Sequence, residues 1–155
     1  DVYPLHILTS NSIEALRQLE PEGDFQSRRF RPSLYIKCDE KNAHLDEFDW
    51  VGGKLFIGDT VITCESRTVR CSMPAQPQQG LEKDSKVLRA LEQHTERHLG
   101  INACVKQPGT IRDGDAVYYQ PASRLSLRRL TQPAGERLRN AVIQRSLKAI
   151  DKKGT

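Results

Sequence analysis

The segment that decides the fold class is residues 54–65, KLFIGDTVITCE. Two short runs rich in apolar and β-branched residues, 54–57 and 60–65, flank the pair Gly58-Asp59. Glycine followed by aspartate between two such runs is typical of a two-residue β-hairpin with a type II′ turn, in which the glycine takes the positive φ. The segment therefore predicts an antiparallel hairpin.

The rest of the chain adds short strands and two helices to this hairpin. Apolar or alternating runs predict strands over 4–8, 33–38, 101–107 and 116–119. Apolar residues at helical spacing predict helices over 12–20, with Asn11 in a capping-box position, and over 85–98, with Gly100 as the stop. This mixture predicts a mainly β, α+β fold, either a β-barrel or a strongly curved sheet with peripheral helices.

Charge is divided unevenly along the 155 residues, a length that fits one folded domain. Residues 1–119 carry 15 basic and 18 acidic residues, whereas residues 120–155 carry nine basic and two acidic ones. We expect an acidic body over 1–119 and, over 120–155, a basic linker followed by an amphipathic helix. Such a tail is either a solvated helix or a binding module for an acidic partner. We expect no membrane partner, and nucleic acid is the disfavoured ligand.

Four cysteines stand at positions 38, 64, 71 and 104, and none forms a C-x-x-C pair. This spacing excludes a zinc ribbon and a thioredoxin motif, and it does not favour a disulfide framework. Free thiols, the absence of an apolar run near 20 residues and the absence of a signal-peptide pattern together predict a cytoplasmic protein.

Two groups of residues stand out as candidates for chemistry. Arg28-Arg29-Phe30-Arg31-Pro32 precedes a predicted strand, and guanidinium groups bind phosphate in a bidentate manner. Pro32 should hold the residue before it extended, which would present Arg29 and Arg31 on the same side. Cys71 lies beside Arg70 where the hairpin strand gives way to a long loop, and nearby cations favour its thiolate. A thiolate there can carry sulfur or bind a soft metal.

Several motifs follow one another in the order found in a known family. The chain resembles the MOSC domain, the carboxyl-terminal module of molybdenum cofactor sulfurases, which also occurs in amidoxime-reducing enzymes and in stand-alone bacterial proteins. The resemblance covers residues 5–119 and rests on five stretches: LHILTSNSI at 5–13, RFRPSL at 29–34, DWVG at 49–52 with LFIGD at 55–59, RC at 70–71, and QPGTIRDGDAV at 107–117.

The resemblance implies a MOSC-type β-barrel with peripheral helices, followed here by the basic carboxyl-terminal helix. It also implies molybdenum cofactor (molybdopterin) binding, with Cys71 as the catalytic residue and molybdenum ligand. Arg31 and Ser33, Thr9 and Ser10 at a helix start, and Arg29 would contact the phosphate and pterin. Ser33 replaces the asparagine that the family usually has after Arg-Pro.

Two activities are open under this resemblance. The chain is either part of a reductase of N-hydroxylated compounds, served by an electron-donor protein, or a sulfur carrier that takes a persulfide on Cys71 from a cysteine desulfurase. Both activities need the same thiolate, so the sequence does not separate them.

Overall fold

The computed structural model describes residues 3–38 and 45–122. Its strands are β1 (Leu5–Thr9), β2 (Leu34–Ile36), β3 (Lys54–Ile57), β4 (Thr60–Val69), β5 (His98–Gln107) and β6 (Val117–Gln120). Its α-helices are α1 (Ser10–Leu19) and α2 (Ser85–Thr95), and its short 3-10 helices are η1 (Ser27–Phe30), η2 (Asp46–Trp50) and η3 (Met73–Ala75). Within these described residues, each predicted strand and helix is present, with ends that differ by a few residues.

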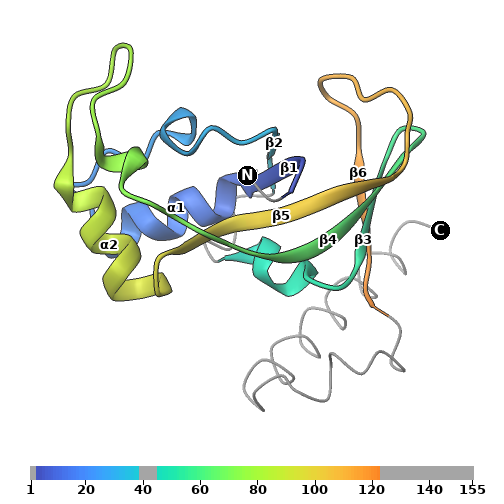
Figure 1. Ribbon diagram of the computed structural model, residues 1–155, viewed down its shortest axis with the longest axis horizontal. Helices are drawn as coiled ribbons and strands as arrows, with labels where there is room; N and C mark the ends of the chain where they lie inside the picture. Colours follow the sequence, from blue (N-terminus) through green and yellow to red (C-terminus); the bar gives the residue numbers. More distant parts are fainter. Residues whose placement is uncertain (1–2, 39–44, 123–155) are drawn as a thin grey trace. The chain divides into compact units, whose positions relative to one another are not determined.

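The six strands form one sheet in the order β2-β1-β5-β4-β3-β6 (Figure 1). Only β1 and β2 pair in parallel, and every other pair is antiparallel. The longest pair, β4 and β5, contains three register shifts, which bend strands and increase their twist. The sheet curls into a half-barrel, which confirms the predicted mainly β, α+β fold.

The predicted hairpin joins β3 to β4. Ile57 pairs with Thr60, so Gly58 and Asp59 form a two-residue loop, and Gly58 has a φ of 52°. Positive φ at this glycine is the feature that the sequence predicted.

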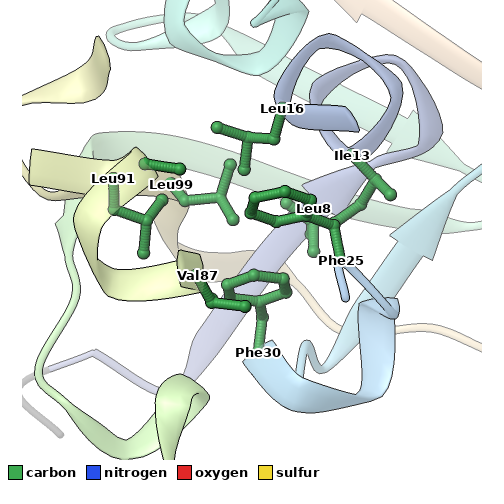
Figure 2. Close-up of a cluster of buried hydrophobic side chains, with 9 residues drawn as sticks. Leu8, Ile13, Leu16, Phe25, Phe30, Val87, Leu91 and Leu99 are labelled. Carbon is green, nitrogen blue, oxygen red and sulfur yellow. The ribbon is translucent and has the colours of Figure 1, made fainter. Parts of the chain in front are cut away.

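Two apolar clusters lie on opposite faces of the sheet. The first packs α1 and α2 against the sheet (Figure 2) and consists of Leu8, Ile13, Leu16, Phe25, Phe30, Val87, Ala90, Leu91 and Leu99. The second lines the inside of the curl and consists of Ile7, Ile36, Leu55, Ile57, Ile62, Cys64, Ile101 and Ala103. Because neighbouring residues of a strand point to opposite faces, Ile7 and Leu8 of β1 belong to different clusters.

Two predicted helix boundaries are wrong. Thr9, not Asn11, is the N-cap of α1, and its side chain accepts a hydrogen bond from the Ser12 backbone N–H. Helix α2 ends before Glu96, which takes the left-handed conformation at a φ of 51°. Gly100 instead lies inside β5 at a φ of 75°, between Leu99 and Ile101, which face different clusters. It interrupts the strand's alternation rather than ending the helix.

No helix of the described residues is long and apolar enough to cross a membrane. The predicted basic linker and amphipathic helix lie, from residue 123 onward, outside the described part of the chain. The domain boundary at 119/120 and the role of the basic segment therefore stay predictions.

Two of the family-like motifs pack on each other. A Cβ atom placed on Gly109 would lie 2.7 Å from the carbonyl carbon of Asp59 and 2.9 Å from the Thr60 nitrogen. A Cβ on Gly58 would lie 2.9 Å from the Thr110 carbonyl oxygen. Because these two glycines have no side chain, the backbone of the hairpin turn can pack directly against the backbone of the loop after β5. Packing therefore explains why both motifs contain a glycine at these positions.

We expect Gly109→Ala to destabilise the fold by roughly 1–3 kcal/mol, because the added methyl group meets backbone atoms that must move together. Urea denaturation measures this change in the free energy of unfolding. Thr110→Ala, at the next exposed position, is the control and should change it by less than about 0.5 kcal/mol. Equal effects of the two substitutions would contradict this packing argument.

Candidate functional site

Cys71 is the most accessible of the four free cysteines. It is exposed and lies two residues beyond the end of β4. Cys64 is buried and Cys38 is half-buried, and burial raises the pKa of these thiols to about 12 and about 11. Both are kept as thiols at neutral pH, so Cys71 is the better candidate for thiolate chemistry.

Arg70 fixes the chain immediately before Cys71. Its backbone N–H donates to the Arg97 carbonyl at 2.7 Å, and its Nη2 donates to the Phe30 carbonyl at 2.8 Å. The guanidinium carbon lies 5.7 Å from the centre of the Phe30 ring, a cation–π distance. Arg70 therefore ties the Cys71 segment to η1, which lies 40 residues earlier in the chain.

The imidazole of His6 is the second ring, after that of Phe30, that the Arg70 guanidinium contacts. Arg70 Nη1 lies 3.3 Å from His6 Nε2 and 3.5 Å from Nδ1. Burial, and then the charge of Arg70, lower the pKa of His6 to about 4, so the ring is neutral at neutral pH. Gly100 makes room for this ring, since a Cβ there would lie 2.2 Å from Nε2. Because the His6 ring is neutral, the Arg70 guanidinium can contact it without repulsion between like charges.

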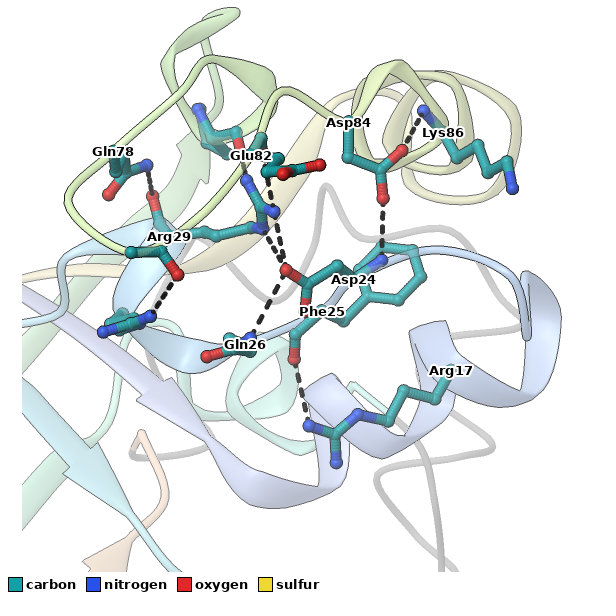
Figure 3. A network of polar contacts seen from close by, with 12 residues as sticks. Arg17, Asp24, Phe25, Gln26, Arg29, Gln78, Glu82, Asp84 and Lys86 are labelled. Carbon is teal, nitrogen blue, oxygen red and sulfur yellow. Dashed lines mark hydrogen bonds and ion pairs between the residues drawn. The ribbon is translucent and has the colours of Figure 1, made fainter.

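Arg29 braces the chain on the other side of Cys71 (Figure 3). Its side chain is 1% exposed and pairs with Asp24, with 2.6 Å between Nη2 and Oδ2. It also donates to the carbonyls of Pro74 at 3.3 Å and Glu82 at 3.0 Å. These bonds attach the loop after Cys71 to η1, so Arg29 is committed to structure rather than free for an anion.

The predicted common orientation of Arg29 and Arg31 is wrong. η1 is a 3-10 helix, and Arg31 caps it in the left-handed conformation at a φ of 50° instead of being extended. Arg29 is drawn inward by the partly exposed Asp24 and by two loop carbonyls, whereas Arg31 is exposed. Positive φ in a residue other than glycine is strained and is found more often at functional sites.

Ser33 joins the same group through His6. The Ser33 N–H donates to the His6 carbonyl at 2.7 Å, and the His6 N–H donates to Ser33 Oγ at 3.1 Å. Ser33 is exposed, so its hydroxyl proton remains available to a ligand. Arg70 thus links three candidate residues. Cys71 follows it in the chain, Arg31 follows Phe30, whose carbonyl Arg70 binds, and Ser33 is hydrogen-bonded to His6, which contacts Arg70.

Thr9 and Ser10 lie at the start of α1, as predicted, but both already have internal partners. Thr9 is fully buried and its hydroxyl donates to Glu47 Oε2 at 2.7 Å. Ser10 Oγ accepts from the Cys38 N–H at 2.9 Å. The buried carboxyl of Glu47 thus stands at the helix end where a phosphate was expected. Their contact with a cofactor stays a prediction, and the geometry gives both residues a structural task.

Sequence reasoning missed three contributors to this arrangement: His6, Glu47 and, as a brace, Arg29. His6 lies within the stretch at 5–13 and Glu47 lies just before the stretch at 49–52, but neither was singled out, because their partners Arg70 and Thr9 lie 64 and 38 residues away in the chain. Among the described residues, no group of three or more His, Cys, Asp or Glu side chains could hold a metal ion. The role of Cys71 as a molybdenum ligand stays a prediction.

Arg29→Met should lower the free energy of unfolding by roughly 2–4 kcal/mol, because it removes the ion-pair partner of Asp24 and the buried donor to two carbonyls. Arg28→Met is the matched control, since Arg28 is exposed and donates one bond, to the Gly80 carbonyl. Urea denaturation of both variants checks this. If Arg29→Met were as stable as Arg28→Met, the contacts of Arg29 would contribute nothing to the free energy of unfolding.

His6 should contribute stability above pH 6.5 that is lost as the pH falls through 4, because its folded-state pKa is depressed. The free-energy advantage of wild type over His6→Gln should shrink by roughly 2–3 kcal/mol between pH 7 and pH 4. Urea denaturation at each pH measures it. His94→Gln, on an exposed part of α2, controls for loss of a histidine. An advantage that stays constant over this range contradicts the expectation.

The comparisons with known proteins agree with this fold. A family model described as the MOSC domain matches residues 1–118. The chain is also similar to the crystal structure of YiiM from Geobacillus stearothermophilus, with 15% sequence identity, a TM-score of 0.56, and coverage of 76% of this chain and 54% of that chain. The chain spans about half the length of YiiM, and at this identity the likeness concerns the fold alone. No curated protein matches it significantly. Because the family model covers most of its length, the chain belongs to the MOSC domain family.

Proposed function

We propose that this chain binds molybdenum cofactor, with Cys71 as the molybdenum ligand. MOSC domains are generally associated with this cofactor, and the assignment of Cys71 goes beyond that association. The observation that carries it is the double brace of arginines around the thiol. Arg70 binds the Phe30 carbonyl and Arg29 binds the Pro74 carbonyl, so the residues on both sides of Cys71 are attached to η1.

The residues that remain available fit the two ends of such a cofactor. Thiolate sulfur is a soft donor suited to a metal that already has sulfur ligands. Arg31 and Ser33 are exposed, and a guanidinium with a neighbouring hydroxyl suits a phosphate or the polar edge of a pterin. Arg29, Thr9 and Ser10 are engaged within the fold, so we propose that Arg31 and Ser33 make the main polar contacts.

When bound, the cofactor would supply redox chemistry at the metal. The reaction that we propose is the reduction of N-hydroxylated compounds, with electrons supplied by an electron-donor protein. The task of this chain is then to hold and orient. Cys71 binds the metal, Arg70 keeps the Cys71 backbone fixed, and neutral His6 supports Arg70. A fixed ligand is needed because small displacements at a reacting centre are costly for rate.

Sulfur carriage is the second candidate, favoured by the accessibility of Cys71 relative to the other cysteines. In that reaction the Cys71 thiolate attacks the outer sulfur of a persulfide on a cysteine desulfurase. A new sulfur–sulfur bond forms on Cys71, and the desulfurase cysteine leaves as its thiolate. No net oxidant is needed, because the transferred sulfur brings its oxidation level with it.

Reconstitution with molybdenum cofactor separates the two candidates. We expect wild-type protein to retain about one molybdenum per chain by elemental mass spectrometry and Cys71→Ala to lose it, since the metal has lost its protein ligand. Arg31→Met should weaken retention roughly tenfold through loss of a charge-assisted contact.

Cys104→Ala is the control, because Cys104 is a half-buried cysteine outside the braced loop. Retention of molybdenum by Cys71→Ala at the wild-type level would exclude the proposed ligand. If no form binds molybdenum but a desulfurase adds one sulfur atom to Cys71 alone, sulfur carriage is the function.

A further inference from the structure

A carboxyl group attaches the 3-10 helix η2 to α1, and the Tyr119 hydroxyl attaches η2 to β6 by donating to the Asp49 carbonyl at 3.0 Å. Glu47 is its one fully buried residue, with an exposed fraction of 0%. The hydroxyls of Thr9 and Ser12 both donate to Glu47 Oε2, the first at 2.7 Å. Beside them, Asn11 Nδ2 donates to Asp46 Oδ2 at 2.6 Å. The deepest attachment of η2 is therefore to the amino end of α1, and it is polar.

The other oxygen of Glu47 is left without a partner. Oε1 is buried and receives no hydrogen bond from any described residue. A charged carboxylate needs hydrogen bonds at both oxygens to compensate for burial, and this one has them at one. Burial accordingly raises the pKa of Glu47 to about 7, although the hydroxyls of Ser12 and Thr9 oppose the rise. The site accommodates the neutral acid better than the anion.

Among the described residues, the charge that acts on Glu47 does not favour the anion either. Asp46, next to Glu47 on η2, raises the pKa of Glu47 further. Cys38, after β2, stays a neutral thiol because burial raises its pKa to about 11. Arg67 of β4 lies 4.5 Å over the ring of Phe48. His6 of β1 faces the opposite side of the sheet from Thr9, because residues three apart in a strand alternate.

We propose that Glu47 is a proton-operated latch: with its proton bound it holds η2 (Asp46–Trp50) against α1, and loss of the proton lets η2 open. In the open state, water can hydrogen-bond to both carboxylate oxygens of Glu47. In the closed state, Oε1 has no partner among the described residues. Gly52, two residues beyond Trp50, donates its backbone N–H to the Cys64 carbonyl at 2.7 Å, so the chain is anchored to β4 there and the opening ends at that point. Opening would also withdraw Phe48 and Trp50 from the second apolar cluster. This latch does not depend on the proposed cofactor.

The direction of the pH effect follows from the two states of Glu47. Opening releases its proton between the ordinary carboxyl range and about pH 7, so the closed state is favoured at low pH and the opening constant rises through this window. Above pH 7 both states are ionised and the constant levels off. Between pH 5 and pH 7.5 it should rise by about 50-fold.

Hydrogen exchange of the amides of residues 45–51, corrected for the intrinsic pH dependence of exchange, measures this opening. Wild type should show the rise and the plateau, and Glu47→Gln should show a flat profile. Glu82→Gln, at an exposed glutamate, is the matched control and should behave as wild type. A flat wild-type profile, or the same rise in Glu47→Gln, would overturn the proposal.

A second variant keeps the test decisive if Glu47→Gln does not fold. Ser12→Ala removes one hydroxyl donor from Oε2, and that donor lowers the pKa of Glu47. In Ser12→Ala the opening constant should therefore level off at a higher pH than in wild type. A plateau that begins at the same or a lower pH would show that Glu47 is not the group that controls opening.

Discussion

Arg70 contacts three parts of the chain that the sequence keeps far apart. It touches the His6 ring on β1, the carbonyl and ring of Phe30 on η1, and, through its own backbone, the turn at Arg97. The conformation of the Cys71 loop and the placement of Arg31 and Ser33 depend on this contact. A cation in this position requires neutral neighbours, and burial keeps His6 neutral. One partly buried, multiply bonded arginine thus joins the sheet to the candidate site.

Buried polar side chains fasten the segments around this site to the two apolar clusters. Arg29 fastens the loop after Cys71, and Glu47 fastens η2 to α1. The two differ in how completely their hydrogen-bonding groups are satisfied. Arg29 has an ion pair and two carbonyls, whereas Glu47 has one bonded and one bare oxygen. A fully bonded group makes a rigid attachment, and a half-bonded one makes an attachment that a proton can alter.

Local pattern accounted for much of the fold. Gly58-Asp59 between two β-rich runs predicted the hairpin, and the turn that forms has the expected positive φ. The short apolar run around Ile7 and the helical spacing around Leu16 predicted their elements. The order of the motifs indicated the family, which the match over residues 1–118 confirms. Gly100 shows the limit, since the same residue type ends helices and relieves crowding inside strands, and the crowding here comes from His6.

The sequence by itself determined the periods of the elements and the family, because both are written in neighbouring residues, and it indicated Cys71 as the candidate thiol. Only the tertiary structure decided which polar residues are free to bind a ligand. Arg29 and Arg31 look alike in the sequence, yet Arg29 is buried on Asp24 and the Pro74 carbonyl and Arg31 is exposed. Their difference is set by partners brought together through folding. A side chain's availability for function is the part of its hydrogen-bonding capacity that the fold has not already used.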